Sequence, residues 1–126
     1  MFPFSSAQQY YLYREPTDMR KTFNGLSGLV RSELGRNPLL GDVFIFLNRR
    51  RDKVKLLVWD RSGFVIYYKC LEQGTFELPS FKAADKSCCL KWQELVLILE
   101  GVALGSVRQR KRYTGPAQPK VAETEV

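Results

Sequence analysis

The 126-residue sequence contains no histidine. Histidine is the side chain that most often serves as an acid or base near neutral pH, and it commonly activates serine and cysteine nucleophiles. The chain therefore offers neither a Ser-His-Asp triad nor a Cys-His pair. It also lacks a phosphate-binding loop of the form G-x-x-x-x-G-K-[ST] and a dinucleotide fingerprint G-x-G-x-x-G.

Cysteine is scarce as well, with three residues at Cys70, Cys88 and Cys89. A structural zinc ion needs four ligands, which three cysteines without C-x-x-C spacing and no histidine do not readily supply. An odd cysteine count without framework spacing indicates free thiols in a reducing compartment. We therefore predict free thiols, no metal and no cofactor.

Acidic residues are scattered along the chain and form no obvious catalytic group. Asp42 and Asp52 bracket a strand-like run, and Asp60 begins a turn. Two of these carboxylates could in principle hold Mg²⁺ in a nuclease-like site, but aspartate at a strand end is far more often a turn former. The sequence therefore predicts a protein that is not an enzyme by itself.

Long apolar runs are also missing. No stretch approaches the ~20 residues that a membrane span needs. The first residues, "MFPFSSAQQYYLYR", have neither the basic nor the apolar region of an export signal. We predict a cytoplasmic protein without a membrane segment.

Positive charge is what the sequence has in excess. It contains 20 Lys+Arg against 13 Asp+Glu, a net charge of +7, and a pI near 9.5. Such an excess favours an anionic partner such as nucleic acid or a membrane surface. A single basic cluster is most simply a solvated loop, but several clusters together favour nucleic-acid binding. The predicted DNA-contacting residues are Arg49, Arg50, Arg51 and Lys53 at a hairpin tip, Arg20 and Lys21 at a helix start, and Arg108, Arg110, Lys111 and Arg112 in the C-terminal tail.

Aromatic side chains lie near these clusters on strand-like runs. Trp59, Phe64, Tyr67 and Tyr68 could stack on bases. At period two, however, about half of them must face the core. The sequence alone leaves open which of them are exposed.

The first part of the chain predicts a strand followed by a long helix. "QQYYLYRE" (8–15) is a short aromatic run that suits an opening strand. In residues 16–38 the apolar spacing becomes helical. The helical face comprises Met19, Phe23, Leu26, Val30 and Leu34. Thr17 or Asp18 is expected to cap this helix, Gly35 or Asn37 to take the left-handed position after it, and Pro38 to end it.

The middle of the chain predicts an antiparallel meander. Three runs alternate and are rich in β-branched and aromatic residues, namely 42–47, 53–59 and 64–71. The connections between them are too short for parallel strands. A short fourth strand is expected at "TFELP" (75–79), and 80–87 is expected to be a polar loop.

The last part predicts a second helix and a tail. Residues 91–102 return to helical spacing, with Trp92, Leu95, Val96 and Leu99 on one face. From about Ser106 the chain is polar and aperiodic, which is typical of disorder. We therefore predict one α+β domain over residues 1–105, with a meander of three to five antiparallel strands, a long N-terminal-half helix and a shorter C-terminal helix packed on it. Residues 106–126 form the predicted disordered, basic tail.

The order of motifs resembles the small TnpB-type accessory protein, encoded by the second reading frame, of the insertion-sequence sixty-six transposon family. The resemblance covers roughly residues 5–102 and rests on several unusual strings in a fixed order. The matching residues are Thr17, Asp18, Met19, Arg20 and Lys21; Gly25 and Leu26; Gly41 to Lys55, including "NRRRDK"; Trp59, Asp60 and Gly63; and Lys69, Leu71, Glu72, Gly74, Phe76 and Pro79. Cys70 departs from the pattern, because many relatives carry an arginine there.

The resemblance implies a non-catalytic accessory protein of bacterial DNA transposition that works beside a separate transposase. Two modes of action remain open at this point. The protein could bind DNA at the transposon ends through its basic hairpin tip and helix start. Alternatively, it could be an adaptor that binds the transposase through an exposed apolar face, with little direct DNA contact.

Overall fold

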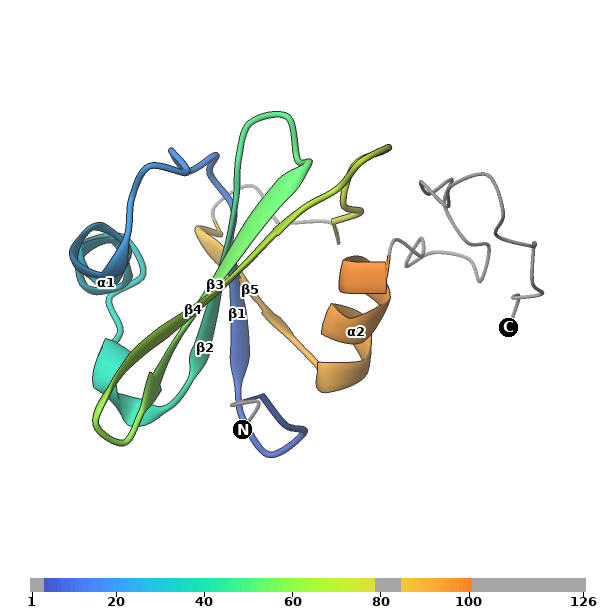
Figure 1. Ribbon diagram of the computed structural model, residues 1–126. Helices are drawn as coiled ribbons and strands as arrows, with labels where there is room; N and C mark the ends of the chain where they lie inside the picture. Colours follow the sequence, from blue (N-terminus) through green and yellow to red (C-terminus); the bar gives the residue numbers. More distant parts are fainter. Residues whose placement is uncertain (1–3, 79–84, 101–126) are drawn as a thin grey trace.

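A five-stranded sheet lies between two helices in the computed structural model, which describes residues 4–78 and 85–100 (Figure 1). The elements in chain order are β1 (Tyr10–Tyr13), α1 (Phe23–Ser32), the short 3-10 helix η1 (Pro38–Leu40), β2 (Val43–Leu47), β3 (Lys53–Asp60), β4 (Gly63–Cys70), β5 (Ser87–Leu90) and α2 (Trp92–Glu100). The α+β class predicted from the sequence is confirmed.

The strands follow the order β4-β3-β2-β1-β5. Strands β2, β3 and β4 form the predicted antiparallel meander. Strand β1 instead pairs in parallel with β2, and β5 pairs antiparallel with β1 at the sheet edge. A parallel pair needs a long crossover, which α1 and η1 provide between β1 and β2.

Each face of the sheet carries one helix and one part of the core. On one face, Leu26 and Val30 of α1 pack with Phe44, Phe46 and Leu57. The opposite face packs against α2 through a second cluster, in which Leu95 and Ile98 are buried. The strands alternate between these clusters because successive side chains point to opposite faces. The two helices therefore lie on opposite faces of the sheet.

The first helix begins later than the sequence predicted, and the expected cap is wrong. Helix α1 starts at Phe23, its N-cap residue is Thr22, and no side chain caps it. Thr17 is buried, and its N–H donates to the carbonyl of Leu47 over 2.8 Å. That bond holds residue 17 beside the end of β2, outside the helix. Phe23, expected in the core, is 46% exposed.

One of the signals predicted for the end of this helix is confirmed. Gly35 adopts a left-handed φ of 63°, a conformation that glycine takes without steric cost. Asn37 then begins η1 by accepting a hydrogen bond from the N–H of Leu39. Helix α1 ends at Ser32, so Pro38, which is the first residue of η1, is not the residue that ends it.

One prediction about the chain after β4 is wrong, and one strand was missed there. Residues 75–78 form no strand; instead, the Phe76 side chain is buried in the core and its N–H donates to the carbonyl of Arg51 over 2.7 Å. The missed strand is β5, in the sequence "SCCL", which begins at Ser87, the last residue of the expected loop. Four residues carry too short an alternation to predict it; pairing with β1 defines it.

The C-terminal helix lies where the sequence predicted it, over Trp92–Glu100. Its start is capped by Glu94, whose carboxylate accepts a hydrogen bond from the N–H of Lys91. Of the expected apolar face, Leu95 is fully buried, and Ile98 is a core residue that the prediction missed. The predicted tail and its four cations lie outside the described residues.

Candidate nucleic-acid interface

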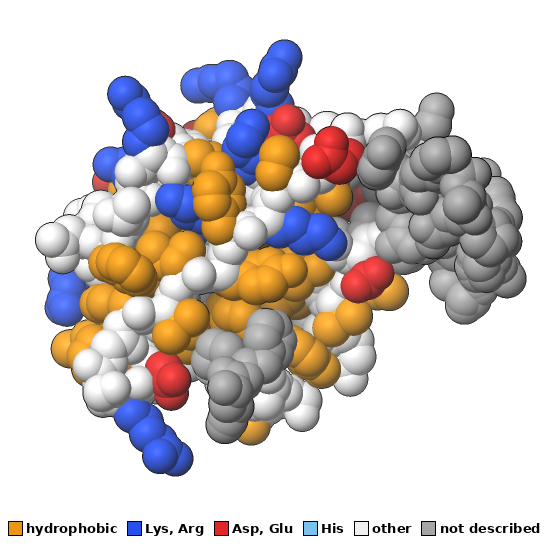
Figure 2. Space-filling model, viewed as in Figure 1, with side chains coloured by type: hydrophobic (Ala, Val, Ile, Leu, Met, Phe, Trp, Pro, Cys, Tyr) orange, Lys and Arg blue, Asp and Glu red, His pale blue; other side chains and the backbone are white. Residues whose placement is uncertain are grey.

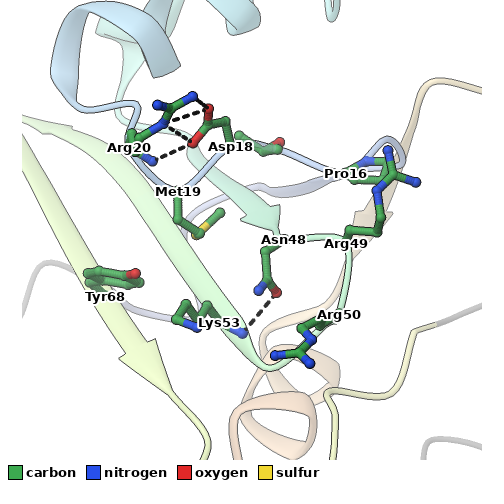
Figure 3. A pocket seen from close by; sticks show the side chains of 10 residues that line it. Pro16, Asp18, Met19, Arg20, Asn48, Arg49, Arg50, Lys53 and Tyr68 are labelled. Atoms are coloured by element: carbon green, nitrogen blue, oxygen red, sulfur yellow. Dashed lines mark hydrogen bonds and ion pairs between the residues drawn. The ribbon is translucent and has the colours of Figure 1, made fainter.

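An open groove of about 710 Å³ lies between the β2–β3 hairpin tip and the segment that precedes α1 (Figure 3). Its lining residues are Pro16, Thr17, Asp18, Met19, Arg20, Asn48, Arg49, Arg50, Lys53 and Tyr68. Residues from three separate parts of the chain therefore meet there. The hydrogen bond from Thr17 to Leu47 fixes the first segment beside the second.

The hairpin tip is built around the side chain of Asn48. Its Oδ1 accepts hydrogen bonds from the N–H groups of Asp52 (3.1 Å) and Lys53 (3.0 Å), and its Nδ2 donates to the Asp52 carboxylate over 2.7 Å. The bond from Asn48 lowers the pKa of Asp52, and the Lys53 ammonium at 3.9 Å adds to that effect. These contacts close the loop through its own side chains, so Arg49 and Arg50 are free to project outward.

The tip is also tied to the rest of the domain. Arg51 adopts a left-handed φ of 61°, and its carbonyl accepts the N–H of Phe76. The carbonyl of Asp52 accepts the N–H of Leu71 over 2.7 Å. The segment after β4 therefore fixes the loop through these two backbone hydrogen bonds. Arg51 is exposed, but it does not line the groove.

On the other wall, Asp18 and Arg20 form an exposed ion pair. The guanidinium of Arg20 contacts both carboxylate oxygens of Asp18, at 2.7 Å in the shortest contact. Asp18 also accepts the N–H of Arg20 over 2.9 Å. These hydrogen bonds lower the pKa of Asp18 to about 2. Asp18, predicted as a helix cap, instead stabilises a local turn and partly neutralises Arg20.

A buried lysine that the sequence analysis did not single out anchors this wall. Lys55 on β3 is 6% exposed, and its Nζ donates to the carbonyls of Met19 and Lys21, each over 2.8 Å. The same Nζ lies 4.7 Å from the ring centroid of Tyr68, its cross-strand partner on β4. The signal for it was the alternation in "KVK", which places Lys53 and Lys55 on the same face as the apolar residues that pack on α1.

The structure brings together two of the three predicted basic clusters. Arg49, Arg50 and Lys53 line the groove opposite Arg20, whereas Lys21 is exposed beside it without lining it. Figure 2 shows Lys and Arg side chains gathered over the β2–β3 hairpin at the top of the molecule. The groove therefore concentrates positive charge from segments about thirty residues apart in sequence.

The aromatic residues separate into exposed and packed ones. Tyr68 lines the groove, whereas Tyr67 points to the other face and packs edge-on against Phe4, with ring centroids 6.2 Å apart. Trp59 and Phe64 pack edge-on against each other at 5.0 Å. Of the four rings that could stack on bases, Tyr68 is the one that the groove presents.

The motif residues Trp59, Asp60 and Gly63 lie away from this groove. Asp60 pairs with Gly63 across the β3–β4 turn, at the opposite end of β3 from the arginine tip. Eight residues of strand separate the two ends by roughly 25 Å. This part of the motif forms a turn and contributes nothing to the basic groove.

Other kinds of site find little support in residues 4–78 and 85–100. No three Cys, Asp or Glu side chains there converge in a way that could hold a metal ion. Cys70, Cys88 and Cys89 are free thiols, and burial raises the pKa of Cys88. Within these ranges, no helix has the length and apolarity required to cross a membrane.

Fold and groove together define a small basic α+β protein with a cation-lined groove beside its β2–β3 hairpin. The chain belongs to the family described as IS66 Orf2 like protein, whose model matches residues 8–109. This confirms the resemblance seen in the motifs and indicates an accessory protein of transposition.

Two relatives come from Sinorhizobium fredii (strain NBRC 101917 / NGR234). The chain is 34% identical to Uncharacterized protein y4jC over 96 residues, which cover 76% of this chain and 80% of that protein. It is 29% identical to Uncharacterized protein y4hO over 102 residues, covering 81% and 87% of the two chains. No solved structure matches the chain.

Proposed function

We propose that this protein is a non-catalytic accessory factor of DNA transposition that holds the phosphate backbone of DNA in its basic groove. Membership in the IS66 Orf2-like family supports the role in transposition. The observation that carries DNA binding is the convergence of hairpin tip and pre-helix segment on one groove. The protein partner in this proposal is a separate transposase, which performs the strand chemistry.

The charge balance of the groove supports an anionic ligand. Its lining contains four cations, Arg20, Arg49, Arg50 and Lys53, against the carboxylate of Asp18. Asp18 is already engaged by Arg20, and the Asp52 carboxylate lies 3.9 Å from the Lys53 ammonium, so Arg49 and Arg50 supply the charge that these two carboxylates leave over. Neighbouring like charges of this kind repel each other until phosphates bind among them.

The contacts available are those of backbone recognition. Arginine guanidinium groups bind phosphate oxygens in a bidentate manner, and lysine supplies a point charge. Phosphate contacts fix the position of a protein on DNA but do not read its sequence. The groove therefore supplies affinity, and selection of transposon ends is left to the transposase.

A different role as an adaptor to the transposase rests on a different surface. Phe23, Leu39 and Leu40 are 46%, 42% and 71% exposed on α1 and η1. Such side chains suit a protein contact more than a DNA contact. In that case the basic groove would only steer the encounter.

A salt titration with matched charge removal tests the proposal. Arg49→Gln with Arg50→Gln removes two cations from the groove, whereas Arg61→Gln with Lys91→Gln removes two from the opposite end of the sheet. The control is well separated because Arg61 lies in the β3–β4 turn and Lys91 follows the end of β5. The affinity for labelled transposon-end DNA and random DNA is measured at several salt concentrations.

We expect the groove variant to flatten the slope of log K against log[salt] by about 2, since each phosphate contact contributes about 0.9. The loss should be equal for both DNA sequences, and the control should keep the parent's slope. If the two variants behave alike, the groove does not bind DNA. Retention of both on immobilised transposase would then favour the adaptor role.

A further inference from the structure

Tyr68 gives the groove a surface that phosphates do not need. The residue is 51% exposed and lies across the groove from Arg49 in Figure 3. A single exposed aromatic residue is ordinary on a protein surface. This one stands inside a concavity lined by cations, and that combination calls for a ligand with both a flat apolar face and negative charge.

The ring is held in place from one side. Lys55, its cross-strand partner, lies 4.7 Å from the ring centroid, and the same ammonium is anchored by the carbonyls of Met19 and Lys21. A cation over an aromatic ring is a favourable contact that limits the motion of both groups. Tyr68 is therefore a platform that loses little freedom when a ligand stacks on it.

The neighbours of Tyr68 continue this surface. The Met19 side chain points into the space between Tyr68, Lys53 and Asn48 (Figure 3). Its polarizable thioether adapts readily to aromatic partners. Beyond it lie Arg50 and Lys53 at the tip, so an aromatic and thioether floor is bordered by cations.

We infer that the groove binds single-stranded DNA, with one unpaired base stacked on Tyr68 and flanking phosphates on Lys53 and Arg50. This inference rests on the proposed function and deepens it by naming unpaired DNA as the ligand class. Proteins that bind single strands combine a positive groove with aromatic rings for stacking. In duplex DNA the faces of each base are covered by its neighbours, so Tyr68 gains a partner only where bases are unpaired.

Three ligands distinguish the contribution of base stacking to binding from that of phosphate charge. Fluorescence anisotropy is measured with a labelled single-stranded oligothymidine of about 20 nucleotides, a blunt-ended duplex of similar charge, and a chain of the same length made of abasic nucleotides. The protein variants are Tyr68→Ala, Tyr68→Phe, which keeps the ring, and Phe23→Ala. Phe23 is a matched control because it is similarly exposed, at 46%, and does not line the groove.

We expect Tyr68→Ala to weaken binding of oligothymidine by about 5- to 150-fold, the range that loss of one stacked base produces. Its affinity for the abasic chain and the duplex should remain that of the parent. Tyr68→Phe and Phe23→Ala should bind all three ligands as the parent does. Tyr68→Gln takes the place of the alanine variant if the latter melts at a lower temperature.

Two outcomes overturn the inference without touching the proposed function. In one, Tyr68→Ala binds oligothymidine as tightly as the parent does. In the other, it weakens duplex and single strand alike, so that the ring does not discriminate between them. If the parent binds none of the ligands even at low salt, both the inference and the proposed DNA-binding function are wrong.

Discussion

The turns at the two ends of β3 have a similar backbone conformation but different surroundings. Each turn places an arginine at positive φ, 61° at Arg51 and 60° at Arg61. Residues with a Cβ atom rarely adopt this conformation, so each turn is held by its neighbours. At the arginine tip the holding groups are Asn48 and the segment after β4. At the other end, the Trp59–Phe64 contact closes the strand pair.

The difference lies in what surrounds each turn. The tip lies beside the pre-helix segment and shares a groove with Arg20 and Tyr68. Arg61 instead follows the carboxylate of Asp60 and lines no part of that groove. Because one arginine is enough for a turn of this kind, the additional cations at the tip are not explained by turn geometry. They are the residues on which the proposed DNA contact rests.

The largest effect on stability is expected from removing the side chain of Asn48, which holds the hairpin tip. Asn48→Ala removes three hydrogen bonds, and net contributions of about 1 kcal/mol each predict a loss of roughly 2–3 kcal/mol in unfolding free energy. Ser62→Ala at the other turn should change it by less than about 0.5 kcal/mol, as exposed substitutions usually do. Urea unfolding of both variants measures the difference. Equal stability of the two would mean that Asn48 does not hold the tip.

A cation added at the tip should increase DNA affinity, whereas one added at the β3–β4 turn should not. Cys70 is exposed and pairs with Lys53 across β3 and β4, so Cys70→Arg places a further cation beside the groove. One more phosphate contact steepens the salt slope by about 0.9, which is roughly 8-fold in affinity at 0.1 M salt, or about 1 kcal/mol. Ser62→Arg adds the same charge at the other turn and should leave DNA affinity unchanged. The same salt titration measures both variants.

A smaller effect is expected on the pH dependence of the melting temperature. The folded state lowers the pKa of Asp52 below its ordinary value of 3.8, chiefly through the hydrogen bond from Asn48. A group of this kind stabilises the fold fully above its unfolded pKa, and that contribution is lost as pH falls through the folded pKa. Asp52→Asn should therefore reduce the fall in melting temperature between pH 5 and pH 2. Melting curves that stay parallel for parent and variant across this range would contradict the assignment.

The smallest effect on unfolding free energy should come from replacing the arginines of the tip. Arg49→Gln with Arg50→Gln leaves the hydrogen bonds of Asn48 intact and relieves repulsion between like charges. Unfolding free energy should stay within about 0.5 kcal/mol of the parent or rise slightly. Arg61→Gln should be similarly neutral. A clear destabilisation by the first pair would show that these arginines serve the fold and not a ligand.

Much of the sheet could be predicted because its signals are local. Alternation and turn residues located β2, β3 and β4 and their antiparallel order. The predicted start of α1 was wrong: the segment before Thr22 lies beside β2 and β3, where it contacts the distant residues Leu47 and Lys55. Strand β5 was missed since four residues acquire strand geometry only through their partner β1.

The charged residues of the candidate site were predicted from the sequence, but the contacts that bring its walls together were not. "NRRRD" named the tip, and its asparagine and aspartate hold the loop through contacts within six residues. Lys55 was missed because its two acceptors are carbonyls more than thirty residues away in sequence. No local pattern marks a lysine that bonds to a distant backbone.

The sequence by itself determined the lack of histidine, the excess of positive charge and the turn that carries Arg49 and Arg50, because these depend on composition and on neighbours in the chain. Only the tertiary structure decided that the pre-helix segment lies beside this turn and that Tyr68 faces the groove while Tyr67 faces the core. The reason is that the parallel pairing of β1 with β2 and the burial of each sheet face arise from contacts between distant residues. Local periodicity does not encode those contacts.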